Sequence, residues 1–420
     1  MSNLNKIFSN VSRVLVGIVF IFSGFTKGLD PLGSAYKFGE YFNAVNLHHM
    51  GDLLLYLSIL QSMAEFLIGI ALLLRLIIRF TSWVTLLFMI FFTTLTLILA
   101  IFNPVSDCGC FGDAIKLTNW QTFFKNLILL PIVIYIFYNR KTYQNRNSII
   151  LQWVIVSVTA ILFVGLSVFC YKHLPVVDFM PYSMGTYIPD KMKIPVTATR
   201  DKYETKLYYI KKGQVKEFSV DNYPWQDTTW RWVKTKTNLV KKGYIPPIHD
   251  FSITSPNGAN LTDLILADTS YSFLFISHNL KEANQQSLQT AEKLASYCNK
   301  TGICKFYALT ASPSSEVENL KKKFGLTLIF YSSDETTLKT IIRSNPGLLL
   351  LKNGIILGKW HYNDFSKLIL NNGNFLSETI TDTRKQLEYY KAFAFFVSLA
   401  LIFCFIFLVA YRFHNKETKI

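Results

Sequence analysis

Long apolar runs alternate with short polar connections through the first 171 residues, after which the pattern becomes that of a soluble protein. A helix needs about 20 apolar residues to cross about 30 Å of hydrocarbon. The runs that predict membrane-spanning helices are residues 11–25, 53–74, 81–102, 120–138 and 149–171 and, near the C-terminus, residues 392–411. The first run has a basic start, but no small-residue cleavage site follows it, so we interpret it as a retained helix.

Lysine and arginine are distributed unevenly over the connections between these runs. They gather after the second run, at Arg75 and Arg79, after the fourth run, and in the C-terminal tail, whereas the opposite connections balance their lysines with acidic residues. Because basic connections stay in the cytoplasm, we expect both termini to be cytoplasmic. Residues 107–113 and 172–391 then lie outside. In a bacterium this is the periplasmic side of the inner membrane, where disulfides persist.

Two patterns divide the soluble region at a Pro-containing break, residues 244–247. Before it, alternating residues predict two strands within 206–220 and a third strand at 229–233. After it, strands alternate with helices, including a helix at 280–298, which predicts an α/β domain with a mixed sheet. The predicted fold class is a multi-pass α-helical membrane protein with an extracytoplasmic α/β domain. The expected divisions are a four-helix membrane domain at 1–147, a fifth span at 148–171, a basic β-rich subdomain at 172–247, the α/β domain at 248–375 and a sixth span at 392–411.

Composition agrees with a membrane protein, since half of the residues are hydrophobic and the mean hydropathy is +0.26. The net charge is +16, and much of it lies between Lys191 and Lys242, where 13 basic residues accompany five acidic ones. A basic surface that follows a membrane span attracts anionic lipid headgroups, which we therefore expect as partners. Nucleic-acid binding is not expected, because no binding motif accompanies the charge.

The densest chemistry in the chain lies in the polar loop 107–113, which reads DCGCFGD. Cys108 and Cys110 are separated by a glycine, which can adopt the unusual backbone angles that a tight Cys-x-Cys ring needs. A disulfide so close in sequence would be strained and easily reduced, which suits an exchange catalyst. Two alternatives stay open. The pair could brace the loop, or it could bind a metal with His48 and His49, because two thiolates alone do not fill a tetrahedral site. We favour catalytic cysteines without a metal.

Charged residues next to the two cysteines affect their reactivity. Asp107 and Asp113 flank the pair and disfavour a thiolate. Reactivity therefore requires ring strain or a nearby cation such as Lys116. Lys125, one to two turns into the fourth run, is expected to extend outward along its alkyl chain.

Glu65 lies near the middle of the second apolar run. An intramembrane carboxylate is unfavourable unless it is paired or faces a polar cavity, so Glu65 is a candidate functional residue. Arg13 or Lys27 in the first run could pair with it, and the carboxylate could carry protons. The alternative is a structural hydrogen bond between helices.

The other four cysteines are judged by their positions. Cys298 ends a predicted helix and Cys304 begins a predicted strand, so a structural disulfide between them is expected on the outer side. Cys170 and Cys404, in the fifth and sixth runs, are expected to be small packing residues. Cys170 could instead resolve a disulfide of the 107–113 loop.

Several residues of the first four runs share one pattern. They are Arg13 with Gly17-Ile18-Val19-Phe20, then Ser23-Gly24-Phe25-Thr26-Lys27, Glu65 with Gly69, and the motif Asp107-Cys108-Gly109-Cys110-Phe111-Gly112. In this combination residues 11–138 resemble the MauE/DoxX family of four-helix membrane proteins. The resemblance implies that the protein supports disulfide formation in a periplasmic enzyme. Through the DoxX relatives it also implies quinone-linked redox chemistry, so a quinone is the candidate cofactor.

The α/β region carries an apolar strand at 273–276 and the segment Asn345-Pro346-Gly347-Leu348. With these features residues 248–365 resemble a TlpA-like thioredoxin fold, which implies a cis peptide bond before Pro346. The Cys-x-x-Cys of that family is missing, because Ser277 is followed by His278 and no cysteine lies between Ser277 and Cys298. Without these thiols the domain cannot exchange disulfides at the usual place.

Two functions are consistent with these features of the sequence. In the first, the protein supports thiol-disulfide maturation of exported proteins through Cys108 and Cys110, either as a membrane oxidoreductase or as an accessory factor. In the second, it is a non-catalytic membrane scaffold whose degenerate thioredoxin-like domain binds a periplasmic partner. The dithiol loop favours the first function, and the missing Cys-x-x-Cys favours the second.

Overall fold

The structure, a computed structural model, describes most of the chain as two compact units. One unit comprises Met1–Thr186 and Ser252–Ile420, and the other Tyr187–Phe251. The described residues are 3–47, 50–105, 107–143, 148–195, 197–199, 201–241 and 243–365, with the isolated positions 381, 388 and 392. The predicted sixth span, residues 392–411, lies outside this part except for its first residue.

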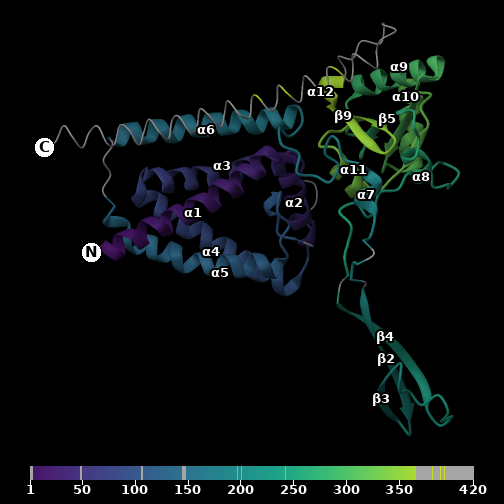
Figure 1. Ribbon diagram of the computed structural model, residues 1–420, viewed down its shortest axis with the longest axis horizontal. Coiled ribbons are helices and arrows are strands. Elements are labelled where there is room, and N and C mark those ends of the chain that lie inside the picture. The colour runs from purple at the N-terminus through teal and green to yellow at the C-terminus, as the bar shows by residue number, and fades with distance from the viewer. Residues whose placement is uncertain are drawn as a thin grey trace. The chain divides into compact units, whose positions relative to one another are not determined.

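Within the described residues, five helices are long and apolar enough to cross a membrane. The first unit begins with α1 (Asn3–Leu29), α2 (Pro31–Ala44), α3 (Leu53–Leu74), α4 (Ile78–Phe102), β1 (Cys110–Asp113), α5 (Asn119–Tyr138), the 3-10 turn η1 (Asn139–Lys141) and α6 (Ile149–Lys172). Four of the five apolar helices, α1, α3, α4 and α5, are seen together near the N-terminus in Figure 1. The prediction of a multi-pass helical membrane region is confirmed. The third span begins at Ile78 rather than at residue 81, because the turn after α3 is very short: Arg75 and Ile77 take left-handed angles, with φ of 54° and 41°.

Glycines allow α1 and α3 to approach closely. A Cβ on Gly24 of α1 would lie 2.5 Å from the backbone nitrogen of Phe66 on α3, and Gly69 of α3 has similarly little room beside α1. Small residues at such positions allow membrane helices to pack backbone to backbone. This packing places Glu65 on α3 next to Lys27 on α1.

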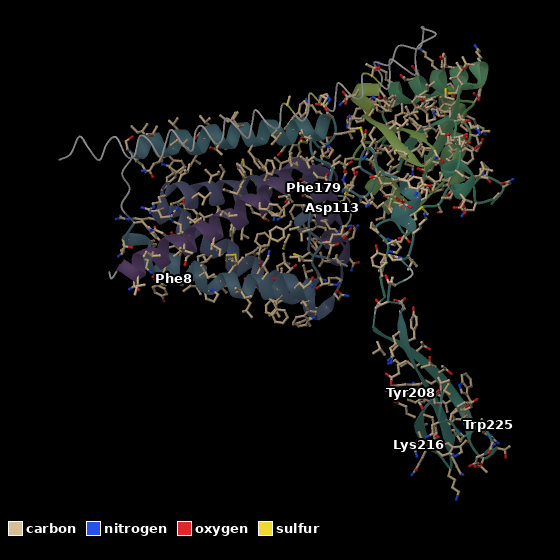
Figure 2. The ribbon with its side chains drawn as sticks, in the orientation of Figure 1. Phe8, Asp113, Phe179, Tyr208, Lys216 and Trp225 are labelled. Atoms are coloured by element: carbon tan, nitrogen blue, oxygen red, sulfur yellow. A yellow bond between two sulfur atoms is a disulfide. The ribbon has the colours of Figure 1, made fainter. Side chains whose placement is uncertain are left out.

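The unit Tyr187–Phe251 holds a small antiparallel sheet in the strand order β3-β2-β4. Its elements are α7 (Ile188–Met192), β2 (Lys202–Lys211), β3 (Gln214–Ser219) and β4 (Arg231–Lys241). Lys212 and Gly213 connect β2 to β3 with φ of 49° and 79°, as a two-residue hairpin requires. Figure 2 labels Tyr208, Lys216 and Trp225 in this unit, and Trp225 is 71% exposed.

The second half of the first unit is an α/β domain whose sheet has the order β7-β6-β5-β8-β9. Strands β5, β6 and β7 are parallel, whereas β8 and β9 are antiparallel to their neighbours. The elements are α8 (Thr262–Leu266), β5 (Tyr271–Ser277), α9 (Gln285–Thr301), β6 (Cys304–Thr310), α10 (Ser314–Phe324), β7 (Phe330–Ser332), α11 (Glu335–Ile341), β8 (Gly347–Lys352), β9 (Ile355–His361) and α12 (Tyr362–Phe365). This strand order is that of a thioredoxin-like fold, so the predicted fold class is confirmed for the described part of the chain.

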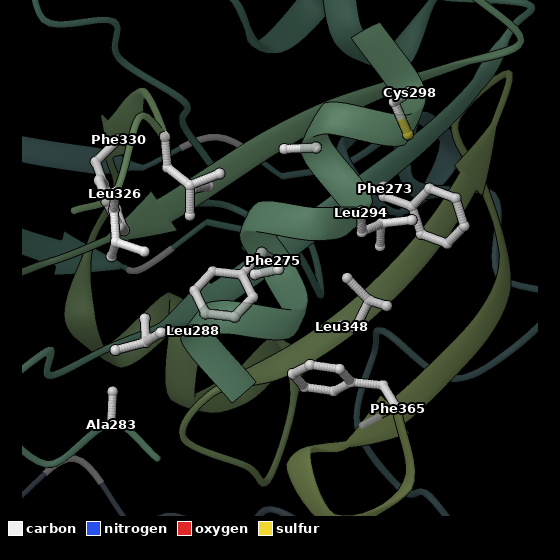
Figure 3. Close-up of a cluster of buried hydrophobic side chains, with 14 of the residues drawn as sticks. Phe273, Phe275, Ala283, Leu288, Leu294, Cys298, Leu326, Phe330, Leu348 and Phe365 are labelled. Carbon is white, nitrogen blue, oxygen red and sulfur yellow. The ribbon is translucent and has the colours of Figure 1, made fainter. Parts of the chain in front are cut away.

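The core of the thioredoxin-like domain forms between α9 and the sheet. Phe273 and Phe275 of β5 point to the same face because side chains alternate along a strand. There they meet Leu288 and Leu294 of α9 and Leu348 of β8, all at most 2% exposed (Figure 3). Burial of such side chains drives folding by about 25 cal/mol per Å² of apolar surface.

One predicted helix of this domain begins later than the sequence pattern indicated. The helix expected at 280–298 begins at Gln285, because the side chain of Asn284 caps it by accepting a hydrogen bond from the Ser287 amide at 3.0 Å. Leu280 fits the apolar period but is buried in the preceding turn.

Candidate dithiol site

The loop that joins α4 to α5 is fixed at its start to α2. Lys37 forms an ion pair with Asp107, with Nζ 3.2 Å from Oδ2, and Asp107 accepts a hydrogen bond from the Gly109 amide at 3.0 Å. The hydroxyl of Tyr41 donates to the carbonyl oxygen of Cys108 at 2.5 Å. Side chains of α2 therefore position the first half of the motif.

Cys108 and Cys110 are free thiols, and their sulfur atoms lie 3.0 Å apart. The chain turns between them at Gly109, whose φ of +59° lies in the left-handed region that glycine adopts without strain. A Cβ at this position would also lie 3.2 Å from the Lys37 side chain. The backbone thus holds two reduced thiols within hydrogen-bond distance of each other.

The surroundings distinguish the two thiols. The hydrogen bond from Cys108, helped by Lys125 and Lys27, lowers the pKa of Cys110 to about 6, although burial and Glu65 oppose this shift. The same hydrogen bond, together with burial, raises the pKa of Cys108 above its usual value. These directions favour the thiolate at Cys110 over the thiolate at Cys108.

Glu65 accepts hydrogen bonds on both carboxylate oxygens at the inner side of the loop. Lys27 Nζ lies 2.7 Å from Oε1 and 2.9 Å from Oε2, and Gln61 donates to Oε1 at 2.7 Å. The Lys27 and Glu65 side chains are only 8% and 6% exposed. The Ser23 hydroxyl oxygen lies 2.7 Å from Oε2 and 2.6 Å from the carbonyl oxygen of Cys110. Polar atoms therefore connect the carboxylate to the dithiol loop.

Of the two cations that the sequence offered as partners for Glu65, Lys27 forms the ion pair. Arg13 donates instead to the carbonyl oxygens of Leu72 and Leu73, the latter at 2.7 Å, where α3 ends. A cation is favourable at this end of a helix, where backbone carbonyls lack partners. The two cations lie 14 residues apart on α1, which is about 21 Å along a helix, so they reach different turns of α3.

A second cation lies beside the loop on α5. The ammonium group of Lys125 is 4.4 Å from the ring centroid of Phe111, and this ring also meets Phe22 of α1 edge-on, with centroids 5.4 Å apart. Lys125 thus extends from α5 toward the loop that precedes this helix. The attraction between a cation and an aromatic face holds it over the residue that follows Cys110.

The far end of the loop is tied to the thioredoxin-like domain by Arg343, which follows α11. Its Nη2 lies 2.8 Å from Asp113 Oδ2, and its Nε lies 2.8 Å from Asp30 Oδ2. Asp30 also caps α2 by accepting a hydrogen bond from the Gly33 amide at 2.8 Å. Lys116, the cation suggested by the sequence, lies 3.9 Å from Asp113 and is 64% exposed. Arg343, which is 7% exposed, is thus the closer and more buried partner of Asp113.

The thioredoxin-like domain keeps the frame of a thiol site without its cysteines. His278 follows β5, where the family has its Cys-x-x-Cys, and the Asn345–Pro346 peptide bond is cis. The ring of His278 meets Tyr36 of α2 edge-on, with centroids 6.2 Å apart. Burial, with a contribution from Lys339, lowers the pKa of His278 to about 4, so this side chain is neutral at physiological pH.

Three of the remaining four cysteines lie in the described part of the chain. Cys298 and Cys304 form a disulfide that links the last turns of α9 to the start of β6. Cys170, near the end of α6, is a free thiol and is 2% exposed. Cys404 lies outside the described residues.

The metal alternative has no complete ligand set in the part of the chain that the structure describes. No group of three or more His, Cys, Asp or Glu side chains is arranged there to hold an ion. His48 and His49, the candidate additional ligands, lie outside the described residues. Cys108 and Cys110 are therefore considered below as thiols.

Comparison with protein families bears directly on the helices that hold this loop. A family model described as methylamine utilisation protein MauE matches residues 5–139, which include α1 to α5 and both cysteines. Residues 5–139 form a MauE family domain. The match confirms the MauE part of the resemblance inferred from the sequence for this region. A second model, a domain of unknown function called DUF8463, matches residues 203–242. No curated protein matches the chain.

Solved structures similar to this chain include three disulfide-related proteins. A candidate protein disulfide isomerase from Bacteroides thetaiotaomicron is 15% identical over 33% of this chain and 86% of its own, with a TM-score of 0.24. A secreted disulfide oxidoreductase from Mycobacterium tuberculosis, homologous to E. coli DsbE, is 11% identical over 25% of this chain and 78% of its own, with a TM-score of 0.21. A candidate thiol-disulfide oxidoreductase from Bacteroides vulgatus is 14% identical over 33% and 94%, with a TM-score of 0.23.

Sequence reasoning missed four residues that hold the loop of the MauE domain: Lys37, Tyr41, Ser23 and Arg343. Ser23 belongs to the quoted family pattern, which gave it no role. Arg343 offered no signal, because it is 230 residues away from Asp113.

Proposed function

We propose that this protein supports thiol-disulfide maturation of exported proteins in a bacterial inner membrane, with Cys108 and Cys110 as its working thiols. The observation that carries the proposal is the pair of free thiols 3.0 Å apart on an anchored loop beside the buried Lys27–Glu65 ion pair. The MauE domain supplies the general setting of a membrane redox role. Both termini are cytoplasmic in this proposal, and residues 172–391 face the periplasm.

The proposed reaction has two balanced halves. In the first, a dithiol of the client attacks the Cys108–Cys110 disulfide through a mixed disulfide, so that the client gains a disulfide and the loop gains two thiols. In the second, the two thiols return to a disulfide and release two electrons and two protons. The acceptor class implied by the DoxX relatives is a lipid-soluble quinone, which would take up both electrons and both protons.

Glu65 is the proposed proton acceptor during reoxidation. The Ser23 hydroxyl has one proton but lies within 2.7 Å of two oxygens, Glu65 Oε2 and the carbonyl oxygen of Cys110. When Glu65 is ionised, Ser23 donates to the carboxylate. When Glu65 is protonated, it donates to Ser23, and Ser23 can donate to the Cys110 carbonyl. Protonation of the carboxylate is thereby coupled to the position of the loop.

The basic sheet at residues 202–241 gives the proposal a membrane-surface component. Exposed Lys216 and Lys234 accompany exposed Trp225 and Trp232 on the described strands and turns. Lysines next to aromatic side chains suit a surface that binds anionic lipid headgroups. We propose that this sheet contacts anionic headgroups, while a periplasmic protein is the client of the dithiol.

The deciding experiment is thiol trapping in intact membranes. The Cys108→Ser variant is expected to leave Cys110 able to hold a client as a mixed disulfide, and exported clients should accumulate in the reduced form. The matched control is Cys170→Ser, which removes a buried thiol outside the loop and should leave clients oxidised. Complete client oxidation in the Cys108→Ser/Cys110→Ser double variant would exclude the redox function.

The second candidate function is a non-catalytic scaffold, and the neutral His278 in place of a cysteine favours it. In a scaffold the dithiol only braces the loop. Both single serine variants would then lower thermal stability while clients stay oxidised, which is the opposite of the trapping result expected above.

A further inference from the structure

Arg343 joins the thioredoxin-like domain to the dithiol loop through a buried pocket that contains two carboxylates and one guanidinium group. Its Nε contacts Asp30, and its Nη2 contacts Asp113 and lies 3.4 Å from the sulfur atom of Met180. Its Nη1 donates to the carbonyl oxygen of Lys339. All three nitrogen atoms of the guanidinium therefore contact a partner, and the single ammonium group of a lysine could not make these three contacts.

The pocket has one positive charge, on Arg343, for the two carboxylates of Asp30 and Asp113. Burial opposes the charge of Arg343, but Asp30 and Asp113 raise its pKa above the usual value. Burial and Asp113 raise the pKa of Asp30, against the effect of Arg343. Removal of the guanidinium would leave two neighbouring carboxylates with only the exposed Lys116 nearby.

Backbone geometry at Gly33 shows how tightly this pocket is built. A Cβ there would collide with the Asp30 carboxylate and would lie 2.8 Å from Arg343 Nη2. A glycine at the third position of α2 thus leaves the room in which the guanidinium meets Asp30.

The pocket acts on the dithiol through β1. Asp113 ends this strand and Cys110 begins it, so at most about 10 Å of chain separates them, and the turn closed by the Gly112 amide on the Gly109 carbonyl oxygen brings them closer. A unit charge within that distance changes the energy of a thiolate measurably when it is not neutralised. The groups that act on Cys110 are Cys108 on its own loop, Lys27 on α1, Glu65 on α3 and Lys125 on α5. The Lys37–Asp107 pair also lies at the start of the loop, and Arg343 meets the far end through Asp113.

We propose that Arg343 is a positioning residue for the dithiol, supplied by the thioredoxin-like domain, and that it keeps Cys110 reactive by neutralising the carboxylates at the end of β1. This inference builds on the proposed function and gives the domain a role that needs no cysteines. The domain contributes one buried cation to a thiol centre that lies in the MauE domain.

The test measures how the alkylation rate of Cys110 depends on pH in the full-length protein in membranes. A maleimide is the probe, and mass spectrometry of the peptide that contains Cys110 excludes signal from other cysteines. Arg343→Gln should move the half-maximal pH upward by about 0.5 to 1 unit, as expected for an added charge within about 10 Å in a medium of intermediate dielectric constant. The control Lys116→Gln removes an exposed cation beside the same carboxylate and should shift it far less.

Charge rescue separates neutralisation from simple tethering. The double variant Arg343→Gln/Asp113→Asn restores the net charge of the pocket without restoring the link, so its half-maximal pH should return toward that of the wild type. An unchanged profile in Arg343→Gln, or a double variant that stays shifted, would overturn the inference. Alkylation does not require a client, so this result is independent of whether the proposed redox function holds.

Discussion

The dithiol loop of the MauE domain and the end of β5 in the thioredoxin-like domain are the two places where this chain has the frame of a thiol site. In the loop, Cys108 and Cys110 lie 3.0 Å apart and their carbonyl oxygens accept hydrogen bonds from Tyr41 and Ser23. At the end of β5, the frame with its cis-proline is present, but His278 stands where a cysteine would act.

The electrostatic surroundings of the two places also differ, since one favours a charged side chain and the other a neutral one. The hydrogen bond from Cys108, together with Lys125 and Lys27, favours a negative charge on Cys110 and lowers its pKa to about 6. At the other place burial dominates, and it lowers the pKa of His278 to about 4 so that the side chain stays neutral. The thioredoxin-like fold is therefore present here without the thiols of a redox site, whereas the short dithiol loop has the cations that favour a thiolate.

The largest expected effect comes from removing the carboxylate beside the loop. Glu65→Leu leaves Lys27 buried without its ion-pair partner, which should cost about 3 to 5 kcal/mol of stability. Glu65→Gln keeps the shape but cannot accept a proton, so client oxidation should slow about tenfold or more while membrane insertion is unchanged. The measurements are thermal unfolding in detergent and the rate of client oxidation.

A control for that comparison is Asp190→Asn in the unit Tyr187–Phe251. Asp190 and its partner Lys193 are 61% and 69% exposed, so the loss of stability should be far smaller. If Glu65→Leu behaves like this control, the carboxylate has no special role in the MauE domain.

The next effect concerns the pH dependence of stability at the degenerate site. The pKa of His278 is about 4 in the folded protein against 6.5 in the unfolded chain, so the unfolded chain binds more protons between these values. This contribution to stability is present above pH 6.5 and is lost as the pH falls toward 4, by at most about 3 kcal/mol.

The measurement is unfolding of the full-length protein between pH 7 and pH 4 for the wild type and His278→Gln. The difference between their curves should shrink as the pH falls, since glutamine does not titrate. Parallel curves would show that burial does not keep His278 neutral, and the electrostatic contrast between the two places would be lost.

The smallest expected effect is that of the Cys298–Cys304 disulfide, which closes a loop of a few residues. Loop-closure entropy for so short a loop predicts a loss of about 2 kcal/mol in Cys298→Ser/Cys304→Ser. Client oxidation should stay at the wild-type level, in contrast to the effect of serine at Cys108 or Cys110. Reduced clients in this variant would place thiol chemistry in the thioredoxin-like domain as well.

The apolar pattern was enough to predict the five described spans and the alternating strands and helices of the α/β domain. Spans and strands follow from the local periodicity of apolar residues and from length, both of which can be read along the chain. The motif at residues 107–113 was equally visible, because its cysteines and glycines are adjacent in sequence. Helix starts such as that of α9 were less visible, because a single capping side chain decides them.

Only the tertiary structure decided which charges meet. Lys27 rather than Arg13 reaches Glu65, because the glycine-mediated contact of α1 with α3 sets which turns face each other. Arg343 reaches Asp113 across 230 residues of chain. Such pairs depend on the rotation and register of whole elements, and no local pattern encodes these. The sequence therefore determined the elements and the thiols, and the packing of the elements determined the charges that surround those thiols.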